Sequence, residues 1–408
     1  MTGGILQLSQ YGAEDILLTG NPQVSFFKTI YKRYTNFQIQ SLQQTIEGNI
    51  DFGNTIYTTI NKSGHLLNNI ILQITLPTLN PPNSNYTYYC YTNNIISSLI
   101  KSVSVSIGGQ TIDKHYGTYF DIIDELNDNK YQKIFSKFNS EYSIRDNYKS
   151  HNIYLPLQFW FCKHYSNSIP LISLLNQDVQ LAIELNDLRN IVKSDSTNWS
   201  NPTTTGNDLD IQIWADYIFL DSNEQKLFSK INHEYLIEQL QYTGDDTLFS
   251  NILSYDFNLH FNHPIKEIFW IIQNNLDTIT NSNTGNNHTK YTHIHVSNSD
   301  TFNTATIQIN GQQLFPHRNA EYFRELMPLK TYEHIPKKHI YLYSFSLFPN
   351  QHQPSGSFNF TNVDTAILNL TFNNTGAGSS TNSKVKIYAV NYNILKIMSG
   401  QASVVYQN

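Results

Sequence analysis

The sequence predicts an all-β fold: two consecutive antiparallel jelly rolls of about eight strands each, with a short N-terminal helix and few short helices in the loops. Composition, a period-two alternation of apolar and polar residues, and an internal duplication predict this fold. Of 408 residues, 13% are aromatic and only 14% are charged, with 27 Tyr and 23 Phe. Because Tyr, Phe, Ile and Thr fit a pleated, half-buried surface, this composition favours strands over helices.

The charge balance and the apolar runs exclude several classes of protein. With 26 Lys and Arg and a net charge of −6, the chain lacks the basic excess of a nucleic-acid-binding protein, so no direct sequence-specific nucleic-acid binding is expected. No apolar run is long enough for a transmembrane helix, and the N-terminus lacks the pattern of a secretory signal. Two cysteines, Cys90 and Cys162, form no disulfide framework and favour a reducing compartment.

The first 36 residues are predicted to form an N-terminal arm that contains a helix. The helical pattern runs from Val24 to Tyr34, with apolar residues on one face and basic residues largely off it. The candidate assembly residues of this arm are Phe27, Lys28, Ile30, Tyr31, Lys32 and Arg33.

Strand patterns dominate the rest of the chain. In Ser102–Ile107 every second residue is apolar and serines fill the positions between, which predicts a half-buried strand. The same alternation occurs in Val179–Leu185 and Ala366–Phe372, and a second short helix is predicted at Tyr119–Leu126. Two Asn/Thr/Ser-rich stretches, 193–208 and 277–304, are predicted to be long surface loops.

Five segments of the first half recur in the same order in the second half, which indicates a duplication. In the strand matches the apolar phase also agrees, although a slip of one residue would turn the apolar face to solvent. The matched pairs are His65–Leu72 with His263–Trp270, Val103–Gln110 with Ala305–Gln312, Tyr119-Phe120 with Tyr322-Phe323, Val179–Asn186 with Ala366–Asn373, and Ile211–Ala215 with Val385–Ala389. We therefore expect a first roll over 37–228 and a second over 229–408.

Recognisable motifs occur along nearly the whole chain. They include Gly20-Asn21-Pro22-Gln23, Tyr34-Thr35-Asn36-Phe37, Leu155-Pro156-Leu157-Gln158-Phe159-Trp160-Phe161 and His233-Glu234-Tyr235-Leu236. The most specific is His352-Gln353-Pro354-Ser355-Gly356-Ser357-Phe358-Asn359-Phe360. Together these motifs resemble those of one family, the major capsid proteins of nucleocytoplasmic large DNA viruses.

This resemblance implies a double jelly roll, with two barrels side by side in each chain. It also implies homotrimers that act as pseudo-hexagonal blocks of an icosahedral shell around double-stranded DNA. The expected partners are the chain itself, neighbouring trimers, minor capsid and penton proteins, and an inner membrane surface that the basic arm residues would meet. The expected location is the virion, with synthesis and assembly in the host cytoplasm. A minor or paralogous capsid protein with the same fold is an alternative.

No catalytic residue, cofactor or metal site is nominated, and we expect no enzyme activity. His288, His293 and His295 are similar to the start of a cupin metal motif, but the Glu ligand is missing, so exposed loop histidines are the preferred interpretation. A bicupin-like metal enzyme and a glycan-binding tandem sandwich remain as alternatives. Among the Asn-x-Ser/Thr triplets, Asn198 and Asn287 in the polar loops are candidate glycosylation sites.

Overall fold

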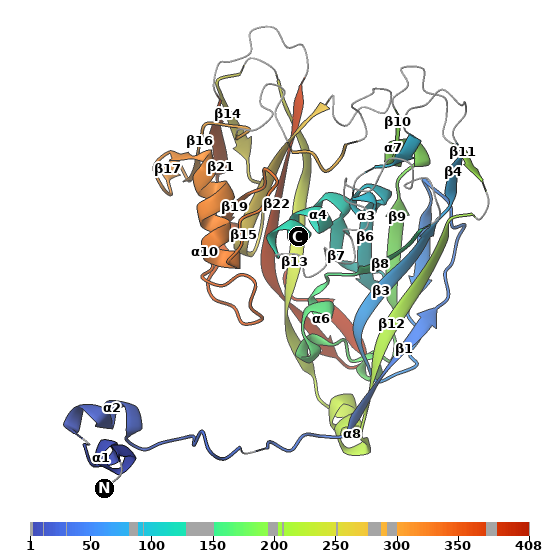
Figure 1. The fold of residues 1–408 in the computed structure, drawn as a ribbon. Coiled ribbons are helices and arrows are strands. Elements are labelled where there is room, and N and C mark those ends of the chain that lie inside the picture. Colours follow the sequence, from blue (N-terminus) through green and yellow to red (C-terminus); the bar gives the residue numbers. More distant parts are fainter. Residues whose placement is uncertain are drawn as a thin grey trace. The chain divides into compact units, whose positions relative to one another are not determined.

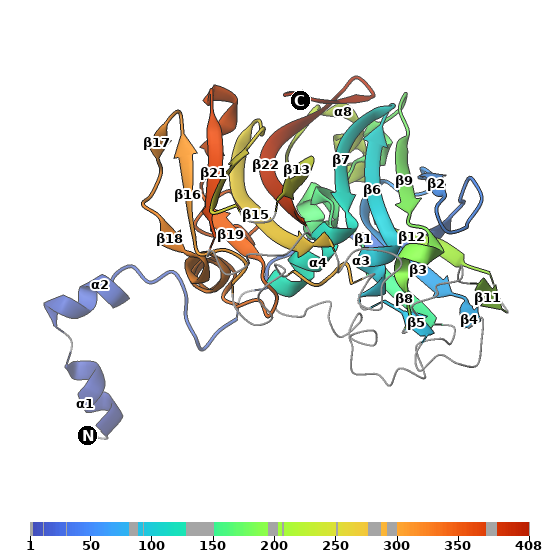
Figure 2. The same ribbon diagram turned by 90° about the horizontal axis from the view of Figure 1, so that it is seen from above.

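A computed structural model describes residues 3–10, 12–29, 31–80, 89–92, 94–127, 151–194, 203–205, 208–249, 252–275, 287–291, 300–372 and 382–407. The chain divides into two compact units, Met1–Asn36 and Phe37–Asn408. The first unit holds α1 (Gly3–Ser9), a 3-10 turn (Ala13–Asp15) and α2 (Ile16–Thr19). The second unit contains all the strands of the described residues, and they form two rolls lying side by side (Figures 1 and 2).

The first roll consists of two four-stranded antiparallel sheets. One has the order β1 (Phe37–Gln44), β12 (Asp210–Leu220), β3 (Leu66–Leu76), β8 (His151–Pro156). The other has the order β2 (Thr55–Thr59), β9 (Val179–Leu185), β6 (Ile100–Ile107), β7 (Gln110–Tyr116). Short pairs between β4 (Thr78–Asn80) and β11 (Thr203–Thr205), and between β5 (Tyr89–Tyr91) and β10 (Val192–Ser194), extend this roll. In both main sheets an early strand pairs with a late one, which is the connectivity of a jelly roll.

The second roll repeats this connectivity strand for strand. Its sheets have the orders β13 (His233–Leu248), β22 (Ser383–Met398), β15 (Pro264–Asn274), β19 (Tyr341–Ser344), and β14 (Ser254–Asn258), β21 (Ala366–Thr371), β16 (Thr304–Ile309), β17 (Gln312–Gln313). Three short strands join them at their edges: β18 (Arg318–Asn319), β20 (Phe358–Asn359) and β23 (Gln401–Val404). The predicted all-β double jelly roll is confirmed.

The duplicated segments lie on equivalent elements. Val103–Gln110 and Ala305–Gln312 each form a hairpin with a two-residue turn, in which Ile107 pairs with Gln110 and Ile309 pairs with Gln312. Both turn residues have positive φ in each hairpin: 59° and 83° at Gly108-Gly109, 48° and 78° at Asn310-Gly311. Such turns match the twist of the flanking strands and favour Gly and Asn.

Few helices interrupt the strands, and among those described none is long and apolar enough to cross a membrane. The predicted helix at Tyr119–Leu126 is confirmed as α4. The helices in the described part of the second unit are α3 (Ile95–Leu99), α4 (Gly117–Leu126), α6 (Trp160–Lys163), α7 (Leu188–Ile191), α8 (Ser222–Lys230) and α10 (Met327–Tyr332). The last of these continues a π-helical turn, η5 (Tyr322–Leu326). Single 3-10 turns are η3 (Tyr165–Asn167), η4 (Leu171–Ser173) and η6 (Phe360–Asn362).

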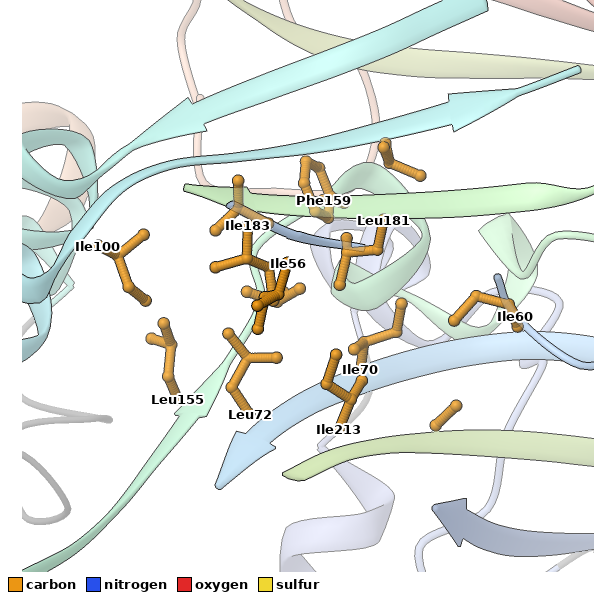
Figure 3. Packing of buried hydrophobic residues seen from close by; sticks show 14 of the residues in the cluster. Ile56, Ile60, Ile70, Leu72, Ile100, Leu155, Phe159, Leu181, Ile183 and Ile213 are labelled. Carbon is orange, nitrogen blue, oxygen red and sulfur yellow. The ribbon is translucent and has the colours of Figure 1, made fainter. Parts of the chain in front are cut away.

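Each roll encloses its own apolar core, built from inward-facing residues of both sheets. In the first roll Ile56 and Leu181 from one sheet meet Leu72 and Ile213 from the other (Figure 3). This core is not drawn from the first half of the chain alone. Residues near the start of β13 and around the β22–β23 turn also belong to it: Ile237, Leu395, Ile397, Ala402 and Val404. Hence the end of the chain helps to fill the roll formed by its beginning.

The two polar stretches are not wholly surface loops, contrary to the prediction, although parts of both lie outside the described residues. Thr203–Thr205 pairs with Thr78–Asn80 as a strand. In the other stretch, Tyr291 and Phe302 are buried, at 2% and 4% exposure. Their aromatic rings override the polar composition around them because burial of so much apolar surface outweighs the local preference for loops.

Candidate assembly surfaces

An apolar layer joins the two rolls. It consists of residues on one face of α4 packed against the outward side of the β13–β22–β15–β19 sheet. Tyr119 and Leu126 of α4 are 3% and 0% exposed, and Phe269 and Tyr388 of the sheet are 0% and 1% exposed. Because the side chains of this layer are as fully buried as those in the cores of the rolls, the layer holds the two rolls together as one block.

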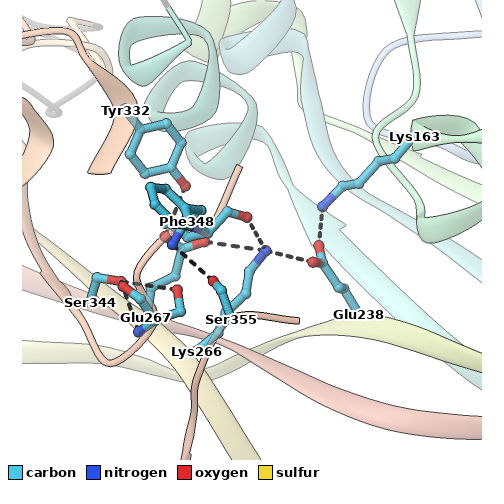
Figure 4. Close-up of polar contacts among 10 residues, drawn as sticks. Lys163, Glu238, Lys266, Glu267, Tyr332, Ser344, Phe348 and Ser355 are labelled. Carbon is cyan, nitrogen blue, oxygen red and sulfur yellow. Dashed lines mark hydrogen bonds and ion pairs between the residues drawn. The ribbon is translucent and has the colours of Figure 1, made fainter. Parts of the chain in front are cut away.

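A buried network of charges also lies at this junction (Figure 4). Glu238 of β13 accepts hydrogen bonds from Lys163 of the first roll and from Lys266 of β15, the latter at 2.6 Å. The Lys266 ammonium also donates to the Pro349 carbonyl at 2.9 Å and lies 3.6 Å from Glu267. Lys266 and Glu267 are 3% and 2% exposed, so their charges must be compensated within the protein.

Glu238 keeps its negative charge because two lysines pair with it. Burial by itself would raise the pKa of Glu238, but Lys163 and Lys266 lower it to about 2. Burial raises the pKa of Glu267, and Lys266 and the Tyr332 hydroxyl, which donates to Glu267 at 2.8 Å, offset part of that effect. The arrangement binds a first-roll side chain to the second roll by charge-assisted hydrogen bonds.

A histidine pair lies beside this network. His164 of the first roll stacks on His352 of the second, with ring centroids 4.2 Å apart and an interplanar angle of 8°. The Ser166 hydroxyl lies 2.7 Å from His164 Nδ1 and 3.1 Å from His352 Nε2. A cavity of about 250 Å³ separates the two rolls here and is lined by Lys163, Lys266 and His352 among others. The motif around His352 therefore contributes to the contact between the rolls.

The N-terminal arm differs from the prediction. The described residues of Val24–Tyr34 form no helix and no regular structure beyond one turn, while the short helices of this unit lie earlier, within Gly3–Thr19. An isolated stretch of eleven residues rarely forms a helix without a surface on which to pack its apolar face. That face has none within its own unit, because Phe27 and Tyr31 are 99% and 87% exposed.

The candidate assembly residues of the arm are therefore not arranged as a helical face. The described members, Phe27, Lys28, Tyr31, Lys32 and Arg33, are all exposed, and Ile30 lies outside the described residues. Their role in assembly stays a prediction.

The loop sites are only partly described. Asn198, His293 and His295 lie outside the described residues. His288 is not an exposed loop residue as expected: it is half-buried, and its Nε2 lies 2.9 Å from the Asn190 carbonyl oxygen. Asn287 is half-buried and precedes this contact, and its glycosylation stays a prediction. Within the described part of the chain, no three His, Cys, Asp or Glu side chains gather as they would around a metal ion.

The sequence prediction did not identify the residues of the junction network. One signal was present: Lys266 and Glu267 interrupt the otherwise apolar segment Ile265–Ile272, a central strand of the duplicated sheet. Adjacent opposite charges inside a buried strand indicate partners elsewhere in the fold, because unpaired charges there are costly. Those partners, however, come from distant parts of the chain, and no local pattern marks them.

Two jelly rolls joined side by side by a buried junction define the class of double jelly-roll proteins. Comparison with known proteins identifies the family. Residues 25–221 match the model described as the major capsid protein N-terminus, and residues 224–403 match that of the large eukaryotic DNA virus major capsid protein. The chain belongs to this family of major capsid proteins.

Individual relatives extend over the full chain. The major capsid proteins of Pyramimonas orientalis virus and Paramecium bursaria Chlorella virus 1 are 34% and 35% identical, with 100% of both chains covered in each case. A quasi-atomic model of the PBCV-1 virus capsid superposes with a TM-score of 0.77 at 30% identity, over 94% of this chain and 100% of the other. The Faustovirus major capsid protein shares the fold, with a TM-score of 0.74 at 12% identity over 97% and 96% of the two chains. The chain is thus a structural component of a virion capsid.

Proposed function

We propose that this capsid protein works as a homotrimer in which three two-lobed chains form a six-lobed, pseudo-hexagonal block. A head-to-tail contact that closes after three copies produces a ring, and blocks of this outline can tile an icosahedral shell. The observation that supports this most directly is the buried junction of α4 and the Lys163–Glu238–Lys266 network, which holds the two rolls at a fixed relation. A rigid two-lobed unit is what a sixfold outline built from three chains requires.

Light scattering on the purified full chain tests this proposal. The expected particle mass is about three times the 47.1 kDa of one chain. A mass of one chain, at concentrations up to those of an assembling shell, would contradict it.

We further propose that the arm, residues 1–36, lies on the inner side of the shell. Its exposed Phe27 and Tyr31 would contact minor capsid and penton proteins, while Lys28, Lys32 and Arg33 would meet the anionic surface of an inner membrane. Deletion of residues 1–36 should then leave the trimer intact but prevent shell assembly. Shells that assemble normally from the truncated chain would contradict the role of the arm.

We place synthesis and assembly in the host-cell cytoplasm and infer a non-enzymatic role. Cys90 and Cys162 are both free thiols, which fits a reducing compartment. We retain 1–36, 37–228 and 229–408 as the functional divisions of the chain. Immunogold labelling of infected cells tests the location, since label confined to the nucleus or to membrane compartments would contradict it.

A further inference from the structure

The duplication places two helical segments at equivalent positions, α4 in the first roll and η5–α10 in the second. The matching dipeptides Tyr119-Phe120 and Tyr322-Phe323 align the two segments. Phe120 belongs to the core of the first roll and Phe323 to the core of the second, at 7% and 0% exposure. The two helical segments are therefore anchored in the same way, each to its own roll.

Their outward faces, by contrast, differ in what covers them. At the spacing set by the tyrosines, Leu326 corresponds to Ile123 and Leu329 corresponds to Leu126. Leu126 is 0% exposed because α4 packs on the second roll, whereas Leu326 and Leu329 are 53% and 47% exposed. With Ile335, at 42% exposure, they line a groove of about 540 Å³. The helix α10, which contributes Leu329 to this groove, lies on the side of the second roll away from the first (Figure 1).

The surface that receives α4 also has a counterpart. On the second roll it includes Phe269 and Tyr388, which face each other across β15 and β22. In the duplicated first roll the corresponding residues are Ile71 and Trp214, which pair with each other across β3 and β12. The second-roll pair is fully covered, whereas Ile71 and Trp214 are only half-buried.

We propose that the η5–α10 groove of one copy docks on the outward face of the β1–β12–β3–β8 sheet of a second copy, around its Ile71 and Trp214. Tyr154 of β8, 45% exposed and opposite Gln73, extends this receiving face. The contact repeats between chains the packing that α4 makes within one chain. The inference rests on the proposed self-association and specifies the surfaces that carry it.

The differences between the two contacts fit their different roles. Glu325 stands where α4 has the buried Ile122, and Gln73 stands where the second roll has the buried Ile271. A contact within one chain forms during folding, so its apolar residues are not exposed to solvent in the folded chain. A contact between separately folded chains must stay soluble before it forms, and such interfaces carry more polar residues.

A double substitution on the groove tests the proposal on the full chain. Leu326→Glu with Leu329→Glu should lower the mass in light scattering from about three chains to one, because it places two charges in the contact. Since both side chains are exposed within a chain, the thermal unfolding of the variant should remain cooperative. Leu175→Glu, which alters a leucine that is 75% exposed on the first roll, is the control and should leave the mass unchanged.

The opposite face gives an independent measurement that does not depend on a charge in the contact. Leu329→Cys and Tyr154→Cys should be protected from a maleimide reagent in the assembled protein, while Leu175→Cys should react quickly. The labelling of each variant is compared with that of the unsubstituted chain, which has two cysteines of its own. If the wild-type chain is itself monomeric, the proposed homotrimer is wrong. Full labelling of Cys at both positions, in a protein of trimeric mass, would overturn this inference and leave the proposed function standing.

Discussion

Asp124 on α4 is a residue whose ionisation should affect stability near neutral pH. Its Oδ1 atom is buried without a hydrogen-bond partner among the described residues. Burial, and then the neighbouring Asp121, raise its pKa from 3.8 to about 7. A carboxyl whose pKa is higher in the folded state contributes stability at low pH that is lost as the pH rises through the folded value.

Asp124→Asn should therefore stabilise the protein increasingly with pH. The difference in unfolding free energy between variant and wild type should be small at pH 4 and grow to about 1–2 kcal/mol by pH 8, allowing for partial solvent screening. Denaturant titrations at several pH values measure it. Asp364→Asn, at an exposed carboxylate, is the control for the loss of one negative charge. A difference that does not vary with pH would refute the role of Asp124.

Lys266 allows a test of the buried network. Lys266→Met should lower the free energy of unfolding by about 3–5 kcal/mol, because it removes the positive charge beside the buried carboxyl groups of Glu238 and Glu267. The matched control is Lys101→Met, which breaks a pair with Glu184 whose lysine is 59% exposed and should cost at most about 1 kcal/mol. Adding Glu238→Gln to Lys266→Met should restore part of the loss. Equal costs for the two lysine variants would show that the network does not stabilise the junction.

Residue patterns predicted the inward and outward phase of the strands well, because that phase depends on local alternation. In β9 the predicted apolar set, Val179 to Leu185 at every second residue, is buried throughout. The buried network could not be predicted, since Glu238 pairs with Lys266 through the assembly of the second-roll sheet, and Lys163 reaches Glu238 only by the packing of the first roll on the second.

At the scale of elements, the paired hairpins predict a graded set of glycine substitutions. Gly109→Ala and Gly311→Ala should each lower the free energy of unfolding by about 1 kcal/mol, because their φ angles are positive. The loss should be no larger, since an added Cβ would meet open space at both positions. Gly108→Ala should cost more, since its Cβ would also lie 2.4 Å from the Gln177 side chain. Thermal melts of the three variants compare them. The explanation fails if Gly108→Ala is the mildest.

The helices show where element prediction from the sequence succeeds and fails. The α4 pattern was predicted correctly, because its apolar face packs on a partner within the same chain. The Val24–Tyr34 pattern has a similar periodicity, but the described residues of its unit offer no such surface and those of the segment form no helix. Periodicity thus identifies a face that can be buried, and the fold decides whether anything covers it.

At the scale of the whole molecule, the duplication predicts two rolls but not how the chain closes them. Ordered matches between the halves were enough to predict the double jelly roll. They gave no sign that the C-terminal hairpin belongs to the first core, because the described part of the first half has no equivalent of β23. Its attachment is specific: the Gln177 side chain accepts a hydrogen bond from the Ala402 N–H at 2.6 Å, and Asn176 N–H donates to the Gly400 carbonyl at 3.2 Å.

This closure predicts that a change near the C-terminus should destabilise the N-terminal roll. Val404, 7% exposed, lies in the first core, while its neighbour Val405 is 38% exposed. Val404→Asp should cost about 2–4 kcal/mol, because it buries a charge without a partner, and Val405→Asp should cost little. Hydrogen exchange should show faster exchange in β9 and β12 for Val404→Asp alone. If only second-roll amides exchanged faster, the rolls would be independent, and the two-lobed block would lack the rigidity that a closed ring of six lobes demands.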